Sequence, residues 1–145
     1  MFEKILYPTD FSDVAVKALR FIKRLKASGA KEVIVLHVAD ERGFDSVHRF
    51  LSDSDFDTLK KNKTEETEKL LKDVEKELSE AGLKVSLRVE TGMPVREILR
   101  VEDEEKVSAI VIGSHGWSNL QEIFLGSVSE KVIRKSKNPV LVVKR

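Results

Sequence analysis

Three glycines and two serines near the end of the chain have the spacing of an anion-binding site. Gly113 and Gly116 follow an apolar run typical of a strand, and Gly126 precedes Ser127 and Ser129 where a helix should begin. A glycine after a strand lets the backbone turn and lets a ligand approach the main chain closely. A helix start has unpaired N–H groups and the positive end of the helix dipole. The pattern favours a phosphate site, although it is neither a P-loop nor a G-x-G-x-x-G fingerprint.

A structural interpretation of the same residues is an alternative. Gly113 and Gly116 would then form a tight turn, and Ser127 would cap a helix. Asp10, after the first apolar run, suits ribose hydroxyls or a divalent cation, or it caps the helix that follows. His115 either contacts phosphate or positions its loop, or it is an exposed loop histidine without a role.

Composition excludes several classes of protein. The chain has 145 residues, the size of one domain, with 26 basic and 25 acidic side chains. A net charge of +1 gives no general electrostatic reason to bind nucleic acid. No apolar run is long enough to span a bilayer, and the first ten residues do not resemble a signal peptide, so we expect a cytoplasmic protein without a membrane partner. The absence of cysteine excludes disulfides and thiolate chemistry.

Five short apolar runs alternate with helical patterns along the chain. The runs cover residues 5–7, 33–38, 85–89, 109–112 and 140–143. Helices are predicted after Ser12, over residues 57–81, from Pro94, and from the Gly126–Ser127 step. Strict alternation of strand and helix predicts a parallel sheet with helices on both faces. The run at 85–89 alternates between apolar and polar residues, so we place it at a sheet edge.

Two segments are harder to assign. Residues 39–56 show no clear periodicity, and His48, Phe50 and Leu51 belong either to a short helical lid or to a disordered excursion. The four carboxylates at 102–105 are expected in solvent rather than in a catalytic site.

Ligands of open parallel sheets bind beyond the carboxyl ends of the strands, where the strand order reverses. The residues that follow the first, second and fourth runs are therefore the candidates, and they include the glycine pair and Asp10.

The spacing Gly113-x2-Gly116-x9-Gly126-Ser127 resembles the ATP-binding motif G-x2-G-x9-G-[ST] of the universal stress protein family. The segments 5–12, 36–38, 91–94 and 139–143 also resemble the family, so the likeness covers essentially the whole chain in the correct order. Ser108 and Trp117 depart from the common pattern without interrupting the motif. Trp117 would shield the ligand, join a partner surface or have no role.

The resemblance implies a three-layer α/β sandwich whose five-stranded parallel sheet has the order 3-2-1-4-5, as in Rossmann-like and flavodoxin-like folds. It implies one domain, residues 1–145, with a nucleotide between the first and fourth strands. Adenine and ribose would be held by Pro8, Thr9, Asp10 and Val38. Ile112, Gly113 and Gly116 would form the floor, and Gly126, Ser127, Val128 and Ser129 would hold the phosphates.

The function that follows is binding of ATP, with Mg²⁺ or Mn²⁺, by a stress-response switch or scaffold that is at most a slow ATPase. Two alternatives stay open: a genuine ATPase or nucleotide-activating enzyme that needs a metal or partner, and a dimeric scaffold without nucleotide. We also expect a homodimer through the apolar C-terminal strand, because exposed edges invite pairing, together with an unidentified downstream protein partner.

Overall fold

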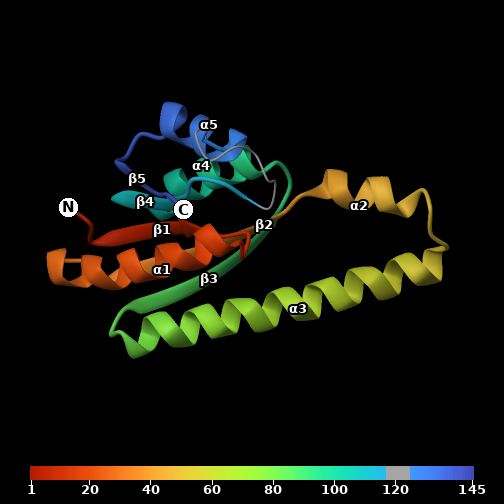
Figure 1. The fold of residues 1–145 in the computed structure, drawn as a ribbon, viewed down its shortest axis with the longest axis horizontal. Helices are drawn as coiled ribbons and strands as arrows, with labels where there is room; N and C mark the ends of the chain where they lie inside the picture. Colours follow the sequence, from red (N-terminus) through yellow and green to blue (C-terminus); the bar gives the residue numbers. More distant parts are fainter. Residues whose placement is uncertain (117–124) are drawn as a thin grey trace.

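The chain folds around one parallel sheet, which a computed structural model describes for residues 1–116 and 125–145. The strands are β1 (Lys4–Pro8), β2 (Glu32–Ala39), β3 (Lys84–Thr91), β4 (Ala109–Gly113) and β5 (Val140–Val143). All pairings between them are parallel, and the order is β3-β2-β1-β4-β5 (Figure 1). The predicted order is confirmed, and the alternating run at 85–89 is an edge strand.

Helices cover both faces of this sheet and complete three layers. The helices in the described part of the chain are α1 (Asp13–Leu25), the 3₁₀ turn η1 (Lys26–Ser28), α2 (Glu41–His48), α3 (Asp53–Glu80), α4 (Pro94–Glu105) and α5 (Ser127–Lys135). The buried side chains of α1 and α3 pack on one face, and those of α4 and α5 pack on the other. Among the described residues, no helix has both the length and the apolar character needed to cross a membrane.

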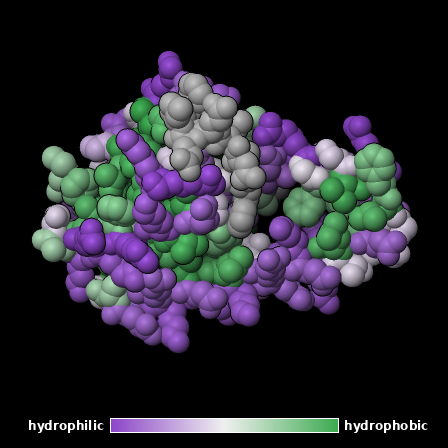
Figure 2. All heavy atoms as spheres, in the orientation of Figure 1, coloured by the Kyte–Doolittle hydropathy of each residue, from purple (hydrophilic) through white to green (hydrophobic). Residues whose placement is uncertain are grey.

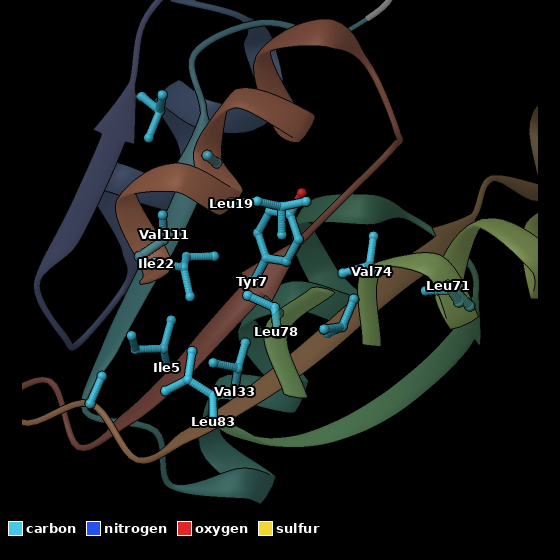
Figure 3. Close-up of a cluster of buried hydrophobic side chains, with 14 residues drawn as sticks. Ile5, Tyr7, Leu19, Ile22, Val33, Leu71, Val74, Leu78, Leu83 and Val111 are labelled. Atoms are coloured by element: carbon cyan, nitrogen blue, oxygen red, sulfur yellow. The ribbon is translucent and has the colours of Figure 1, made fainter. Parts of the chain in front are cut away.

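Successive residues of each central strand are buried on opposite faces of the sheet. Ile5 and Tyr7 of β1 lie beneath α1 and α3, in one cluster with Leu19 of α1 and Leu78 of α3 (Figure 3). Leu6 belongs to the second core, beneath α4 and α5. Because β1, β2 and β4 are covered on both sides, their sequences are almost continuously apolar.

Tyr7 places a polar group inside the first core. Its side chain is fully buried, and its hydroxyl donates a hydrogen bond to the Ala15 carbonyl of α1. Burial raises the pKa of this phenol to about 12, since the ionised form would lose its hydration.

Stability should fall at alkaline pH because of Tyr7. The unfolded chain releases the phenolic proton near pH 10, whereas the folded protein keeps it until about pH 12. The contribution of this proton to the free energy of unfolding is fully present below pH 10 and is lost as the pH rises from 10 to 12. The free energy of unfolding should fall by up to about 2–3 kcal/mol over this range. Urea unfolding of the parent and of Tyr7→Phe across this range measures it. Parallel pH profiles for the two proteins would contradict the prediction.

The segment expected to be irregular is largely helical. Asp40 caps α2 by accepting from the Arg42 N–H (3.1 Å), and Ser52 caps α3 by accepting from the Asp55 N–H (3.2 Å). Helix α3 therefore begins at Asp53, four residues before the predicted start. Helix α2 and the beginning of α3 form an arm that extends away from the sheet (Figure 1), and hydrophobic side chains gather at its far end (Figure 2).

The prediction that residues 102–105 are all solvated is wrong for Glu102. This carboxylate is only 3% exposed. Its Oε1 accepts hydrogen bonds from the Ser136 hydroxyl (2.6 Å) and from the backbone N–H groups of Lys137 (3.2 Å) and Asn138 (3.1 Å). Glu102 thus joins α4 to the segment that leads into β5, which is a structural role.

Candidate functional site

A cavity of about 220 Å³ opens at the carboxyl ends of β1 and β4. From these neighbouring strands the chain continues to helices on opposite faces of the sheet, so the connections diverge and leave a crevice. Every residue that the sequence assigned to nucleotide binding lines this cavity. Their individual roles stay predictions.

One end of the cavity is apolar. Its walls include Pro8, Leu36, Val38, Pro94, Ile98 and Ile112. Leu36, Pro94 and Ile98 were not among the predicted site residues. Leu36 could have been predicted from Val38, because residues two apart in a strand point to the same face of the sheet. This end has the chemistry to cover a flat aromatic base.

Residues 9–12 form a tight turn at the mouth of the cavity. The buried Thr9 donates its N–H to the Leu36 carbonyl (2.8 Å), and the Asp10 Oδ1 accepts from the Ser12 N–H (3.0 Å). Helix α1 is capped by Ser12, whose hydroxyl accepts from the Ala15 N–H. The alternative in which Asp10 caps this helix is therefore wrong.

Neighbouring atoms lie close to all three motif glycines. A Cβ on Gly113 would lie 3.0 Å from Val14 Cγ1 and 3.2 Å from the Ala15 nitrogen, and one on Gly116 would lie 2.7 Å from Asp10 Oδ2. None of the three has a positive φ, and that of Gly126 is −62°. They are required for close approach between segments and not for an unusual backbone angle.

The start of α5 forms the polar wall. Gly126 donates its N–H to the Ser114 carbonyl (2.7 Å), and the first bond within the helix runs from the Glu130 N–H to the Gly126 carbonyl (3.0 Å). The N–H groups of Ser127, Val128 and Ser129 precede that bond, so the helix itself supplies no acceptor for them. They and the helix dipole suit an anion.

Two serines of this wall differ in their surroundings. Ser127 is exposed, whereas Ser129 is 3% exposed and its hydroxyl donates to the Gly113 carbonyl (2.6 Å). That bond fastens α5 to the end of β4 and uses the Ser129 proton. The Ser129 contribution to an anion site would therefore come from its backbone N–H.

His115 is buried in the loop after β4. It is 7% exposed, and its Nδ1 lies 2.8 Å from the Ser114 Oγ. The alternative of an exposed loop histidine is therefore wrong, and a role in positioning the loop is consistent with this contact. Trp117 lies outside the described residues.

The cavity has no Lys or Arg among the described residues that line it. The sequence between Gly116 and Gly126 contains no Lys or Arg either. Nearby, the Arg42 guanidinium donates to both oxygens of Asp40 and lowers the pKa of that carboxyl. A multiply charged anion in the cavity would depend on backbone N–H groups, hydroxyls and a metal ion for neutralisation.

Over the described ranges, no group of three or more His, Asp or Glu side chains is arranged to hold a metal. Mg²⁺ that is bound with a nucleotide commonly takes only one or two carboxylates and completes its shell with phosphate oxygens and water. Among the described lining residues, the one carboxylate is that of Asp10.

Comparison with known proteins identifies the family. Residues 1–144 match the universal stress protein family. Universal stress protein MJ0577 of Methanocaldococcus jannaschii is 46% identical over 156 residues, covering 100% of this chain and 96% of that protein. Universal stress protein YxiE of Bacillus subtilis is 34% identical over 148 residues, covering 99% and 100% of the two chains.

Solved structures agree with this result. The structure of MJ0577 has a TM-score of 0.86 and 48% identity, with 100% of this chain and 97% of that one covered. A universal stress protein in complex with cAMP has a TM-score of 0.66 and 26% identity, with 99% and 97% covered. Family match, full-length identity and fold agree, and the chain belongs to the universal stress protein family.

Proposed function

We propose that this protein binds ATP, together with Mg²⁺ or Mn²⁺, and acts as a nucleotide-dependent switch or scaffold in a cytoplasmic stress response. The observation that carries the proposal is the polar wall of the cavity. Gly126 brings the start of α5 against the loop after β4, while Gly113 and Gly116 lie close to α1 and to Asp10. The residues Ser127, Val128 and Ser129, whose N–H groups have no acceptor within the helix, line the cavity.

Different lining residues would bind the base, the ribose and the phosphates. The apolar end, with Val38, Ile98 and Ile112, would cover adenine, and Asp10 would accept from the ribose hydroxyls or share a metal ion. The phosphates would lie at the start of α5. The cAMP complex of a 26% identical relative supports an adenine nucleotide as the ligand.

Hydrolysis of the bound ATP should be slow. Asp10 and His115 are the titratable side chains among the described residues that line the cavity, and both have hydrogen-bond partners in the protein: Asp10 Oδ1 accepts from the Ser12 N–H, and His115 Nδ1 lies beside Ser114 Oγ. These contacts support a structural role for both side chains rather than that of a general base. We therefore favour a protein that forms a single domain over residues 1–145 and binds ATP as a signal. Measuring ATP turnover with Mg²⁺ and with Mn²⁺ distinguishes this protein from a genuine ATPase.

Native mass spectrometry and calorimetry test the proposal. Purified protein should retain ATP or should release heat when ATP and Mg²⁺ are added after nucleotide has been removed. Absence of both heat and thermal stabilisation at millimolar ATP, in protein shown to be free of nucleotide, would refute nucleotide binding and favour the scaffold without ligand.

The exposed strand β5 supports a homodimer. The carbonyls of Val143 and of Pro139, which precedes β5, accept from the N–H groups of Ser114, just after β4, and of Ile110 in β4 (2.8 and 2.9 Å). In a parallel strand both backbone groups of a residue face the same neighbour, and successive residues alternate. The backbone groups of Val140 and Val142 therefore point away from β4, where a second copy can pair through a two-fold axis.

Replacing Val142 with proline should convert the homodimer to a folded monomer. The change removes an outward N–H and leaves the hydrogen bonds to β4 intact. Leu141→Pro is the matched control, since its N–H faces β4 and its loss should lower the melting temperature instead. Analytical ultracentrifugation measures the state, and a monomeric parent at micromolar concentration would contradict the dimer.

A further inference from the structure

The turn at residues 9–12 has an unfavourable backbone conformation. Phe11 has a φ of 61°, in the left-handed region that side chains other than glycine seldom adopt. Its N–H donates to the Thr9 hydroxyl (3.1 Å), while the next N–H, from Ser12, donates to Asp10 Oδ1 (3.0 Å). Both bonds are formed with Phe11 in this conformation, and the second holds the Asp10 carboxylate, so the path of the turn and the position of that carboxylate are linked.

That carboxylate is placed against the glycine loop. The site that a Cβ would occupy on Gly116 is 2.7 Å from Asp10 Oδ2. A relaxed turn would move the carboxylate relative to Gly116 and change the mouth of the cavity. Strained backbone of this kind persists only where the surrounding structure holds it.

His37 of β2 supplies the holding contacts. Its Nδ1 lies 2.9 Å from the Thr9 carbonyl. A carbonyl can only accept, so Nδ1 carries the proton. The His37 ring also packs against the Phe11 ring, with centroids 5.1 Å apart and planes inclined by 34°. Together with the Thr9 N–H bond to Leu36, this fixes both backbone groups of Thr9 to β2.

His37 acts from behind the cavity. The next residue, Val38, lines the cavity, and consecutive strand residues point to opposite faces. Neither His37 nor Phe11 is among the residues that line the cavity, and Phe11 packs against the core beneath α1 and α3. Any effect of His37 on a ligand must therefore pass through the turn.

We propose that His37 is a positioning residue for the nucleotide: through the Thr9 carbonyl and the Phe11 ring it holds the left-handed turn that sets Asp10 at the cavity mouth. The inference rests on the proposed function and adds to it the control of affinity at the nucleoside end. ATP and AMP share that end, so a defect in the turn affects both nucleotides equally.

Two substitutions of His37 separate its contacts. His37→Leu keeps an apolar group against Phe11 and removes the donor, whereas His37→Asn keeps an N–H donor close to the position of Nδ1. Calorimetry with ATP·Mg²⁺ and with AMP should show that His37→Leu weakens both by a similar factor, about fivefold or more. His37→Asn should return to within about twofold of the parent. A purely structural role would lower the melting temperature without changing either dissociation constant.

Phe11 provides a second, matched pair that does not depend on the folding of the His37 variants. Glycine at this position adopts a φ of 61° without steric cost, and alanine does not, although both lose the ring. Phe11→Ala should therefore bind both nucleotides more weakly than Phe11→Gly. Equal binding by these two variants would overturn the inference.

The parent protein is measured first, because it distinguishes the two possible failures. A parent that binds no ATP refutes the proposed function and this inference with it. A parent that binds ATP, with His37→Leu binding equally well, refutes the inference alone.

Discussion

Replacing Gly126 with valine should weaken ATP binding by at least about tenfold, which corresponds to about 1.4 kcal/mol. A Cβ at this position would lie 3.0 Å from the Ser114 carbonyl oxygen and 3.3 Å from the His115 Cα, and these are backbone atoms with little freedom to move. The branched side chain must push the start of α5 away from the loop after β4. That movement lengthens the bond from the Gly126 N–H to Ser114 (2.7 Å) and displaces the N–H groups that would hold the phosphates.

The backbone angle at Gly126 contributes nothing to this effect. Its φ of −62° is available to any residue, so the steric contact alone distinguishes valine from glycine. The fold should survive, because Gly126 is outside both apolar cores, and circular dichroism must show this before affinity is measured.

Ser127→Ala is the matched control for Gly126→Val. Ser127 is exposed and lies in the first turn of α5. Alanine removes only its hydroxyl, and with it one hydrogen bond to the phosphates worth on the order of 1 kcal/mol, and leaves the backbone N–H donors in place. It should therefore weaken ATP binding less than Gly126→Val does. Unchanged affinity in folded Gly126→Val would refute the phosphate role of this wall.

Removing divalent metal should weaken ATP binding by at least about tenfold and AMP binding by less than about threefold. The described cavity wall contains no Lys or Arg, and Asp10 adds a negative charge of its own. The triphosphate then depends on a cation, since a few N–H groups neutralise only part of its charge. AMP has one phosphate and places less charge at the start of α5.

Calorimetry with each nucleotide, in excess Mg²⁺ and in excess EDTA, measures the difference. Magnesium returned to the chelated sample should restore the affinity for ATP, which shows that chelation has not damaged the protein. If ATP binds equally well in EDTA, the protein balances the phosphate charge without a metal ion.

The sequence by itself predicted the alternation of strands and helices and the edge of the sheet where the candidate site lies. The strands 33–38 and 109–112 are nearly all apolar, because strands covered on both faces have no solvent side, and the helices between the strands follow from local periodicity. The spaced glycines and Asp10 follow strands whose carboxyl ends share one edge of the sheet. The strand order that makes β1 and β4 neighbours was implied by the family resemblance and not by local patterns, and the structure confirms it.

Local pattern did not reveal the arm. Helix α2 and the beginning of α3 depend on the caps Asp40 and Ser52, and on Phe56 packing against Phe44 and His48. Because only a few apolar residues join these two polar helices, the sequence shows little helical repeat of apolar residues there.

Only the tertiary structure decided what individual residues do. The motif glycines are required because Val14, Asp10 and Ser114 lie against them. Glu102 is buried because a segment more than thirty residues away supplies its donors, and His37 reaches a carbonyl 28 residues earlier in the chain. These contacts join residues from different elements, so their energies depend on distances that exist only after the sheet and helices have packed, and no local pattern of residue types records them.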